Sequence, residues 1–94
     1  MNRGEIWQTN LRTVSKVVVI GVVPNHPNVV VVPLRDDLAV TPTLLAVRDP
    51  GTGLIADVAS MTGLSRTRLL DHVGEVDHKT LAAIGSGIMA FLDL

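Results

Sequence analysis

Two aliphatic runs close together constrain the fold of this chain more than any other feature. The first spans residues 17–23 and the second residues 29–34, with only residues 24–28 between them. β-Branched side chains fit a pleated strand, and runs without polar alternation are typical of strands covered on both faces. The connector holds two prolines and two asparagines, which suit a turn. We therefore expect a central antiparallel hairpin that the rest of the chain covers.

Pro33 lies inside the second of these runs. Proline has no amide hydrogen to give to a neighbouring strand. The second strand is therefore expected to end, to bulge or to lie at a sheet edge at this residue.

The length of 94 residues suits one small domain, residues 1–94, with a single modest core. Hydrophobic residues make up 47% of the chain, yet Trp7 and Phe91 are its only aromatic residues. The core must then consist of aliphatic side chains. A core so rich in them, in so short a chain, often continues across an interface between two copies, and we expect a homodimer.

Composition also excludes several classes of protein. The chain has no cysteine, so disulfides and thiolate metal sites are impossible; this and the absence of a signal peptide favour a cytoplasmic protein. The aliphatic runs are far shorter than the roughly 20 residues of a membrane span, and we expect no membrane contact. Because the net charge is −1, a surface for nucleic acid must be a local cluster of cations.

The remaining pattern predicts an α+β, mainly β fold. We expect strands at residues 5–11, 41–47, 54–61 and 71–76, a tight turn at 49–53, and a short helical turn after a cap at Ser65. Asp77 is expected to cap a helix from about residue 78 to 92, whose buried face carries Leu81, Ile84, Ile88 and Phe91 or Leu92. Five to six antiparallel strands with a C-terminal helix favour a strongly curved, barrel-like sheet.

The order of these signals resembles the MazF/PemK family of toxins. Residues 3–11 are similar to that family's "RGEIW-x-x-x-L" start, residues 29–34 to its central strand, and residues 53–58, 64–69 and 73–76 to its final third. The resemblance covers nearly the whole chain. It implies an SH3-like barrel, a homodimer, a cognate antitoxin, and metal-independent, sequence-specific cleavage of single-stranded RNA without a cofactor.

The family usually carries an Arg-Pro pair just before the second strand and a Thr or Ser after the third. This chain has Ser15 and Lys16 at the first place and Arg35 at the second. The resemblance therefore assigns the cations Arg12, Lys16 and Arg35 as candidate catalytic residues around the cleaved phosphate. The candidate RNA-binding residues are Ser15, Thr41, Thr43 and Arg66. For Arg35, the alternative from the residues alone is a solvated charge paired with its acidic neighbours Asp36 and Asp37.

These departures leave three other functions open: a gyrase-binding toxin of the related CcdB type, a catalytically silent member that binds only an antitoxin, and a structural barrel of unknown partner. Trp7 could stack on a base, but a core or interface anchor is favoured. His26 is expected at the hairpin tip, away from the candidate site, and His72 and His78 at the surface. No two histidines or carboxylates fall at a spacing that demands a metal, so we expect no metal ion.

Overall fold

The computed structural model describes residues 1–36 and 44–93, which form one antiparallel sheet and one α-helix. The chain also forms two short 3₁₀ turns, η2 (Val58–Ser60) and η3 (Arg66–Arg68). The strands are β1 (Glu5–Thr9), β2 (Lys16–Val22), β3 (Asn28–Arg35), β4 (Ala46–Arg48), β5 (Ile55–Asp57), β6 (Thr62–Ser65) and β7 (Leu69–Glu75), and the helix is α1 (His78–Leu92).

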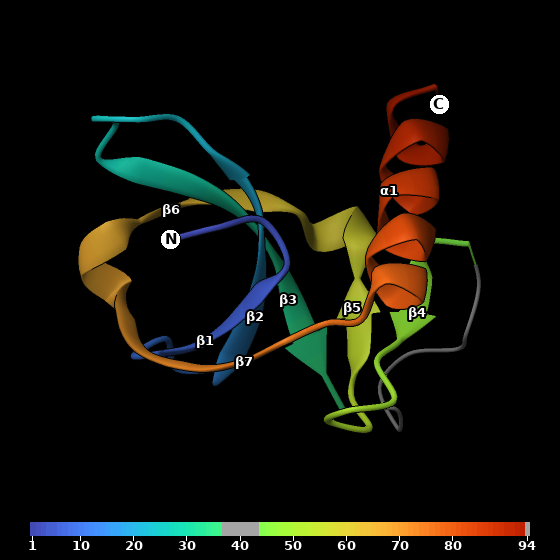
Figure 1. Cartoon of the computed structure of the whole chain (residues 1–94), viewed down its shortest axis with the longest axis horizontal. Helices are drawn as coiled ribbons and strands as arrows, with labels where there is room; N and C mark the ends of the chain where they lie inside the picture. Colours follow the sequence, from blue (N-terminus) through green and yellow to red (C-terminus); the bar gives the residue numbers. More distant parts are fainter. Residues whose placement is uncertain (37–43, 94) are drawn as a thin grey trace.

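The strands run in the order β4-β5-β3-β2-β1-β7, and β6 pairs with the first half of β3. Figure 1 shows β1, β2, β3, β6 and β7 curling into a ring, with β4, β5 and α1 on the other side. The expected mainly β barrel with a C-terminal helix is confirmed. The described residues contain seven strands rather than five or six, because residues 62–65 pair with β3 as a separate strand.

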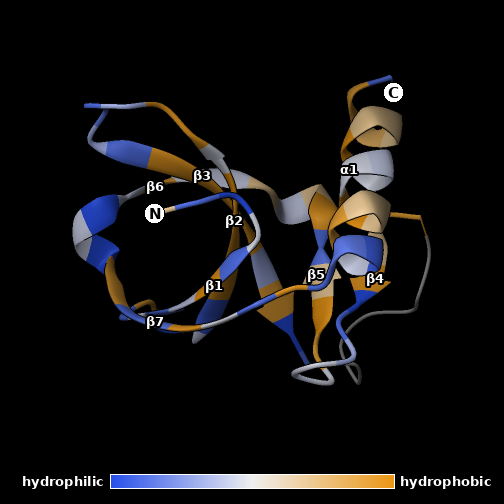
Figure 2. Cartoon of the chain, viewed as in Figure 1, coloured by the Kyte–Doolittle hydropathy of each residue, from blue (hydrophilic) through white to orange (hydrophobic). Residues whose placement is uncertain are grey.

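The central hairpin of β2 and β3 is covered on both faces, as its unbroken aliphatic pattern predicted. Val17, Val19 and Val31 point into a cluster inside the ring, whereas Val18 and Val32 join a second cluster beneath α1. Figure 2 shows this hydrophobic centre as the orange stretches of β2 and β3. The expectation of a single core was wrong, because alternate residues of these strands face opposite sides and each side is covered separately.

Pro33 neither ends β3 nor lies on an outer strand. It is paired with Val17 on one side, and β3 continues to Arg35. On the other side, β6 pairs with β3 only up to Val31, and β5 begins to pair at Leu34. The proline therefore lies in a gap between two partner strands, where no ladder hydrogen bond is required of it.

The C-terminal helix begins and ends where the sequence pattern predicted. The side chain of Asp77 accepts a hydrogen bond from the backbone nitrogen of Thr80 at 2.7 Å, which caps the first turn. Ile84 is completely buried, and Leu81 and Ile88 pack against the same cluster. For the last position, expected to be Phe91 or Leu92, Phe91 is half-buried whereas Leu92 is 71% exposed.

The other element boundaries differ from expectation by a few residues. The strand expected at residues 41–47 appears as β4, and residues 41–43 lie outside the described part of the chain. The segment 54–61 leaves the sheet after Asp57 to form η2. The tight turn at 49–53 is confirmed, because Asp49 accepts hydrogen bonds from the backbone and hydroxyl of Thr52. Among the described residues, no helix has the length and apolar character needed to cross a lipid bilayer.

Candidate functional site

The open end of the β2–β3 hairpin brings together two of the predicted site residues. Lys16 pairs with Leu34, so the residue before β2 and the last residue of β3, Ser15 and Arg35, flank the same position of the ladder. Both line a cavity of about 340 Å³. The complete lining is Thr13, Ser15, Leu34, Arg35, Asp36 and Leu54.

Arg35 is held in place by an acidic residue that is distant in sequence. Its Nε donates a hydrogen bond to Oδ2 of Asp57 at 2.9 Å, and the Oγ of Ser60 donates to the same oxygen at 2.8 Å. Arginine has five N–H donors, and the contact through Nε uses one of them. The alternative interpretation named two other acidic residues, Asp36 and Asp37, and Asp37 lies outside the described residues.

The two other candidate cations do not line this cavity. Lys16 is half-buried and lines a separate cavity of about 210 Å³ together with Asp49, Thr52 and Glu75. Arg12 is exposed in the loop between β1 and β2 and lines neither cavity. Of the three predicted catalytic cations, Arg35 alone lines the cavity that Ser15 lines.

Arg66 lies at the other end of the hairpin. Its Nε donates to the backbone oxygen of His26 at 2.8 Å, and its Nη2 donates to the backbone oxygen of Val23 at 3.1 Å. These contacts attach η3 to the hairpin tip, where Asn25 has a positive φ of 64°. The candidate residues Thr41 and Thr43 lie outside the described residues.

Sequence reasoning missed Asp57 and Thr13 as parts of this site. The contact between Arg35 and Asp57 joins residues 22 apart, and no local pattern indicates it. Asp57 could have been identified only from the pairing of β3 with β5. This pairing places Arg35 opposite Ile55, on the strand that ends at Asp57. Thr13 belongs to the irregular loop before β2, which has no periodicity to interpret.

Trp7 and the histidines lie away from this cavity. The Trp7 ring packs partly against the cluster inside the ring and stacks on His72, with centroids 5.4 Å apart. Its Nε1 donates to the carboxylate of Glu5 at 3.0 Å, and this hydrogen bond holds the pKa of Glu5 below its ordinary value. His26 lies at the hairpin tip, where its Nδ1 accepts from the backbone nitrogen of Asn28 at 3.0 Å.

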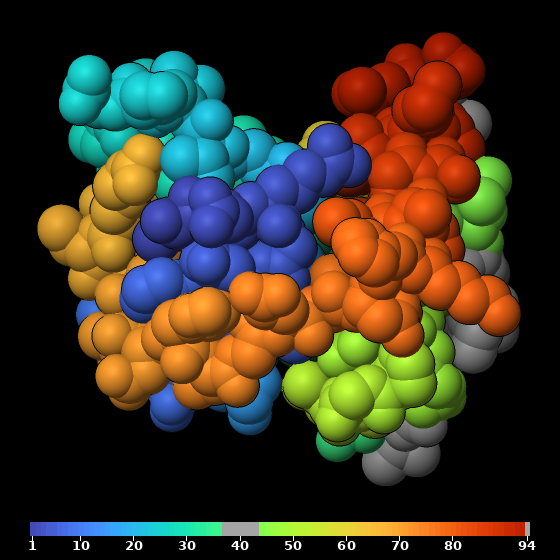
Figure 3. Space-filling view, viewed as in Figure 1, coloured from blue at the N-terminus to red at the C-terminus, as the bar shows by residue number. Residues whose placement is uncertain are grey.

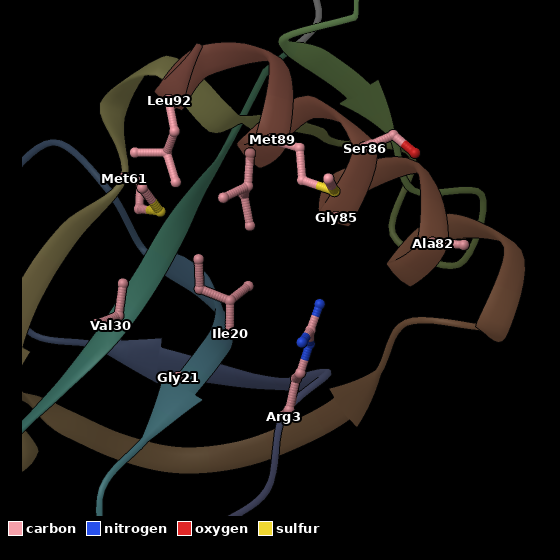
Figure 4. Close-up of a pocket in the computed structure, with 11 residues that line it drawn as sticks. Arg3, Ile20, Gly21, Val30, Met61, Ala82, Gly85, Ser86, Met89 and Leu92 are labelled. Atoms are coloured by element: carbon pink, nitrogen blue, oxygen red, sulfur yellow. The ribbon is translucent and has the colours of Figure 1, made fainter.

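A larger and mainly apolar groove separates α1 from the hairpin. Figure 3 shows it as the notch between the hairpin (cyan) and the helix (red), and Figure 4 shows Met61, Met89 and Leu92 facing Val30 and Ile20 across it. Its volume is about 650 Å³. Met89 and Leu92 are 70% and 71% exposed, which is unusual for large apolar side chains and typical of a surface that another protein covers.

The small cavity contains the groups needed to handle a phosphodiester. A guanidinium can form bidentate hydrogen bonds with phosphate oxygens. A hydroxyl can donate or accept a hydrogen bond, and a carboxylate can accept a proton. Arg35, Ser15 and Asp36 supply one group of each kind. The cavity therefore fits a phosphate ester better than an apolar ligand.

Comparison with solved structures identifies the fold. The chain is similar to an endoribonuclease in complex with its cognate antitoxin from a mycobacterial species, with a TM-score of 0.83, 20% identity, and 100% and 96% of the two chains covered. It is also similar to an endoribonuclease from a mycobacterial species (TM-score 0.81, 23% identity, 100% and 95% covered) and to the Mycobacterium tuberculosis toxin MazF-mt6 (0.73, 16%, 99% and 98%). No family model and no curated protein sequence matches the chain. The chain therefore has the fold of these three proteins.

Proposed function

We propose that this protein is the toxin of a type II toxin–antitoxin pair and a sequence-specific, metal-independent endoribonuclease acting on single-stranded RNA. The observation that carries the proposal is the cavity shared by Ser15 and Arg35 at the open end of the hairpin. The MazF/PemK family places a guanidinium before its second strand and a hydroxyl after its third. Here the hydroxyl stands before β2 and the guanidinium at the end of β3, so both groups are retained with their places exchanged.

Cleavage would proceed by attack of the ribose 2′-oxygen on the adjacent phosphorus, while the bond from phosphorus to the 5′-oxygen breaks. The products are a 2′,3′-cyclic phosphate and a 5′-hydroxyl. Arg35, positioned by Asp57, stabilises the charge that develops on the phosphoryl oxygens. Asp36 accepts the proton from the 2′-hydroxyl, and Ser15 donates a hydrogen bond to a phosphoryl oxygen. The departing 5′-oxygen takes a proton from solvent water, which gives the 5′-hydroxyl.

The remaining candidate residues act in binding the RNA strand. Lys16 and Arg12 lie on the segment that leads into the hairpin, where their charges attract the backbone phosphates on either side of the cut. Thr41, Thr43 and Arg66 are proposed to contact the strand further from the cleaved bond. For Arg66 this contact adds to its structural role at the hairpin tip.

The proposal includes three further properties: a homodimer, a cognate antitoxin that blocks RNA access, and action in the cytoplasm. The solved relative with a cognate antitoxin supports the second of these, because its fold matches this chain from end to end. The exposed apolar groove beside α1 supports the presence of a protein partner.

The direct test is incubation of the purified protein with a long single-stranded RNA in EDTA, followed by mapping of the cut sites. We expect discrete cuts at a short motif, with cyclic phosphate ends. Arg35→Ala should lower the single-turnover rate by about 10²–10³-fold, the usual cost of losing one donor to a developing oxyanion. Arg68→Ala is the matched control, because Arg68 is exposed and lines neither of the cavities near the hairpin mouth.

Two results would overturn the proposal. The first is the absence of cuts by a correctly folded protein, most clearly if the same preparation inhibits DNA supercoiling by gyrase. The second is cutting that is equally fast in Arg35→Ala and in Arg68→Ala, which would place the chemistry outside this cavity.

A further inference from the structure

A second cluster of chemically active side chains lies between β1 and β7, away from the Ser15–Arg35 cavity. Glu5, His72 and Glu75 each offer one potential metal-ligand atom, and these atoms lie within 4.8 Å of one another. Glu5 comes from β1 and the other two from β7, the outer strand at one end of the sheet order. Nothing in the proposed RNA cleavage uses these three residues.

An irregular sheet register brings the cluster together. In a regular strand, residues 72 and 75 would point to opposite faces, because side chains alternate. Here Ile6 pairs with Gly74 but Trp7 pairs with His72, so Val73 is an extra residue in β7. This bulge turns His72 to the same face as Glu75. Bulges commonly redirect a side chain in this way at functional positions.

The pairing of β1 with β7 places two carboxylates, those of Glu5 and Glu75, close together. The two residues stand directly opposite one another on neighbouring strands, a placement in which like charges repel. Glu5 is only 8% exposed, and its Oε1 accepts a hydrogen bond from the indole of Trp7. A buried carboxylate with a second carboxylate across from it favours a bound cation.

His72 is oriented as metal-binding histidines are. Its Nε2 lies 3.0 Å from the backbone oxygen of Gly74, which makes Nε2 the protonated nitrogen and leaves the lone pair on Nδ1. Trp7 restrains the ring by stacking on it and also holds Glu5 through its indole N–H. Both a carboxylate and an imidazole of the cluster therefore have the supporting contacts that fix metal ligands in place.

We propose that Glu5, His72 and Glu75 form a binding site for a divalent transition-metal ion, best suited to Zn²⁺, which fastens the outer strand β7 to β1. One imidazole and two carboxylates are ligands that Zn²⁺ accepts, with water in the fourth position. Tetrahedral coordination needs ligand atoms roughly 3.3 Å apart, given bonds of about 2.0–2.1 Å. His72 and Glu75 are exposed, so rotation of their side chains can close the remaining distance.

This site could not be predicted from the sequence, because residues 72 and 75 would point to opposite faces of a regular strand. Only the bulge at Val73 and the pairing of β7 with β1 create the cluster. The proposed metal site is separate from the proposed catalytic cavity. The ion therefore stabilises the fold, and RNA cleavage does not require it and proceeds in EDTA.

The test is isothermal titration calorimetry of the chelator-treated chain with ZnCl₂ alone, together with thermal unfolding at a series of Zn²⁺ concentrations. We expect one Zn²⁺ per chain and an unfolding temperature that rises with Zn²⁺ concentration. His72→Asn and Glu75→Gln should each weaken binding by more than tenfold. Both replaced residues are exposed, so these variants are expected to fold. Trp7→Phe, which keeps an aromatic ring but removes the indole N–H, should weaken binding by about tenfold.

His26→Asn and His78→Asn are the matched controls, because each removes an exposed histidine that lies outside the cluster. Both should bind Zn²⁺ as the native chain does. The proposal is overturned if the native chain shows no heat of binding. It is also overturned if His72→Asn binds as tightly as the native chain, or if a control variant loses the ion.

Discussion

The Nε of Arg35 donates to Oδ2 of Asp57 at 2.9 Å, which joins the end of β3 to the end of β5. The Oγ of Ser60 donates to the same oxygen, so the carboxylate itself is restrained. The two charged side chains are 32% and 19% exposed, and an ion pair this close to solvent adds little to stability. The ion pair between Arg35 and Asp57 instead restrains the orientation of the guanidinium beside the cavity.

Removal of the Asp57 carboxylate should therefore lower activity through Arg35. We expect Asp57→Ala to reduce the single-turnover cleavage rate by about tenfold, a smaller loss than removal of the guanidinium itself. In an Arg35→Ala background the same change should have no further effect on the rate. The measurement is a double-mutant cycle on cleavage rates, with thermal unfolding of each variant as the check on structure. Losses that add in the double variant would show that Asp57 does not act through Arg35.

The exchanged places of the hydroxyl and the guanidinium give a second prediction. Arg35→Ser alone leaves two hydroxyls in the cavity, and Ser15→Arg alone adds a second guanidinium beside the first, so both should cut RNA poorly. The double variant Ser15→Arg/Arg35→Ser restores one group of each kind in the arrangement typical of MazF/PemK toxins. We expect it to cut at least tenfold faster than Arg35→Ser.

The comparison is made on one RNA with single-turnover rates, and circular dichroism confirms that each variant folds. A double variant no faster than Arg35→Ser would mean that the two positions are not equivalent. The proposal that the groups have changed places would then be wrong.

The elements could be predicted from the sequence where the pattern is local. The unbroken aliphatic runs indicated β2 and β3. The cap at Asp77 and the apolar spacing as far as residue 91 or 92 indicated both ends of α1, because these signals depend only on neighbouring residues. The separation of β6 was not predicted. It depends on pairing with Asn28–Val31 of β3, and the sequence of Thr62–Ser65 has no strand pattern of its own.

The candidate site could likewise be predicted only in part from the sequence. The resemblance pointed to Ser15 and Arg35, and the hairpin register places them at one cavity. Lys16 is next to Ser15 in sequence yet lines a different cavity, since successive residues of a strand face opposite sides. Asp57 could not be found without knowing that β5 pairs with the end of β3.

Two glycines of α1 should respond to alanine in opposite ways. A Cβ on Gly87 would lie 2.6 Å from the backbone oxygen of Leu44 and 3.3 Å from Val58, so the helix must move away. A Cβ on Gly85 would meet only the end of the flexible Arg3 side chain, at 3.4 Å. We expect Gly87→Ala to cost about 1–3 kcal/mol of unfolding free energy, as overpacking does. Gly85→Ala should gain up to about 1 kcal/mol from helix propensity.

Thermal unfolding of the two variants measures this difference directly. In a domain of this size, 1 kcal/mol corresponds to a change of about 4–8 °C in the unfolding temperature. Equal changes in the two variants would contradict the close approach of α1 to Leu44.

The cap of α1 should make stability depend on pH under acidic conditions. Hydrogen bonds from Thr80 hold the pKa of Asp77 below its ordinary value of 3.8. A lowered pKa in the folded state means that the unfolded chain takes up the proton first, so this stabilisation is complete above about pH 5 and is lost as the pH falls through 3.8 and below. Asp77→Asn keeps an oxygen that can accept the bond from Thr80 but cannot titrate.

We therefore expect Asp77→Asn to unfold close to the native temperature at pH 7 and to lose less stability than the native chain between pH 5 and pH 3. Glu5, whose pKa is also lowered, contributes to both proteins, so the difference between the two curves isolates Asp77. Asp77→Ala, which has no acceptor, should unfold at a lower temperature at pH 7 and share the weaker acid dependence. Parallel curves for the native chain and Asp77→Asn across this range would show that the Asp77 carboxylate stabilises the helix no better than its protonated form.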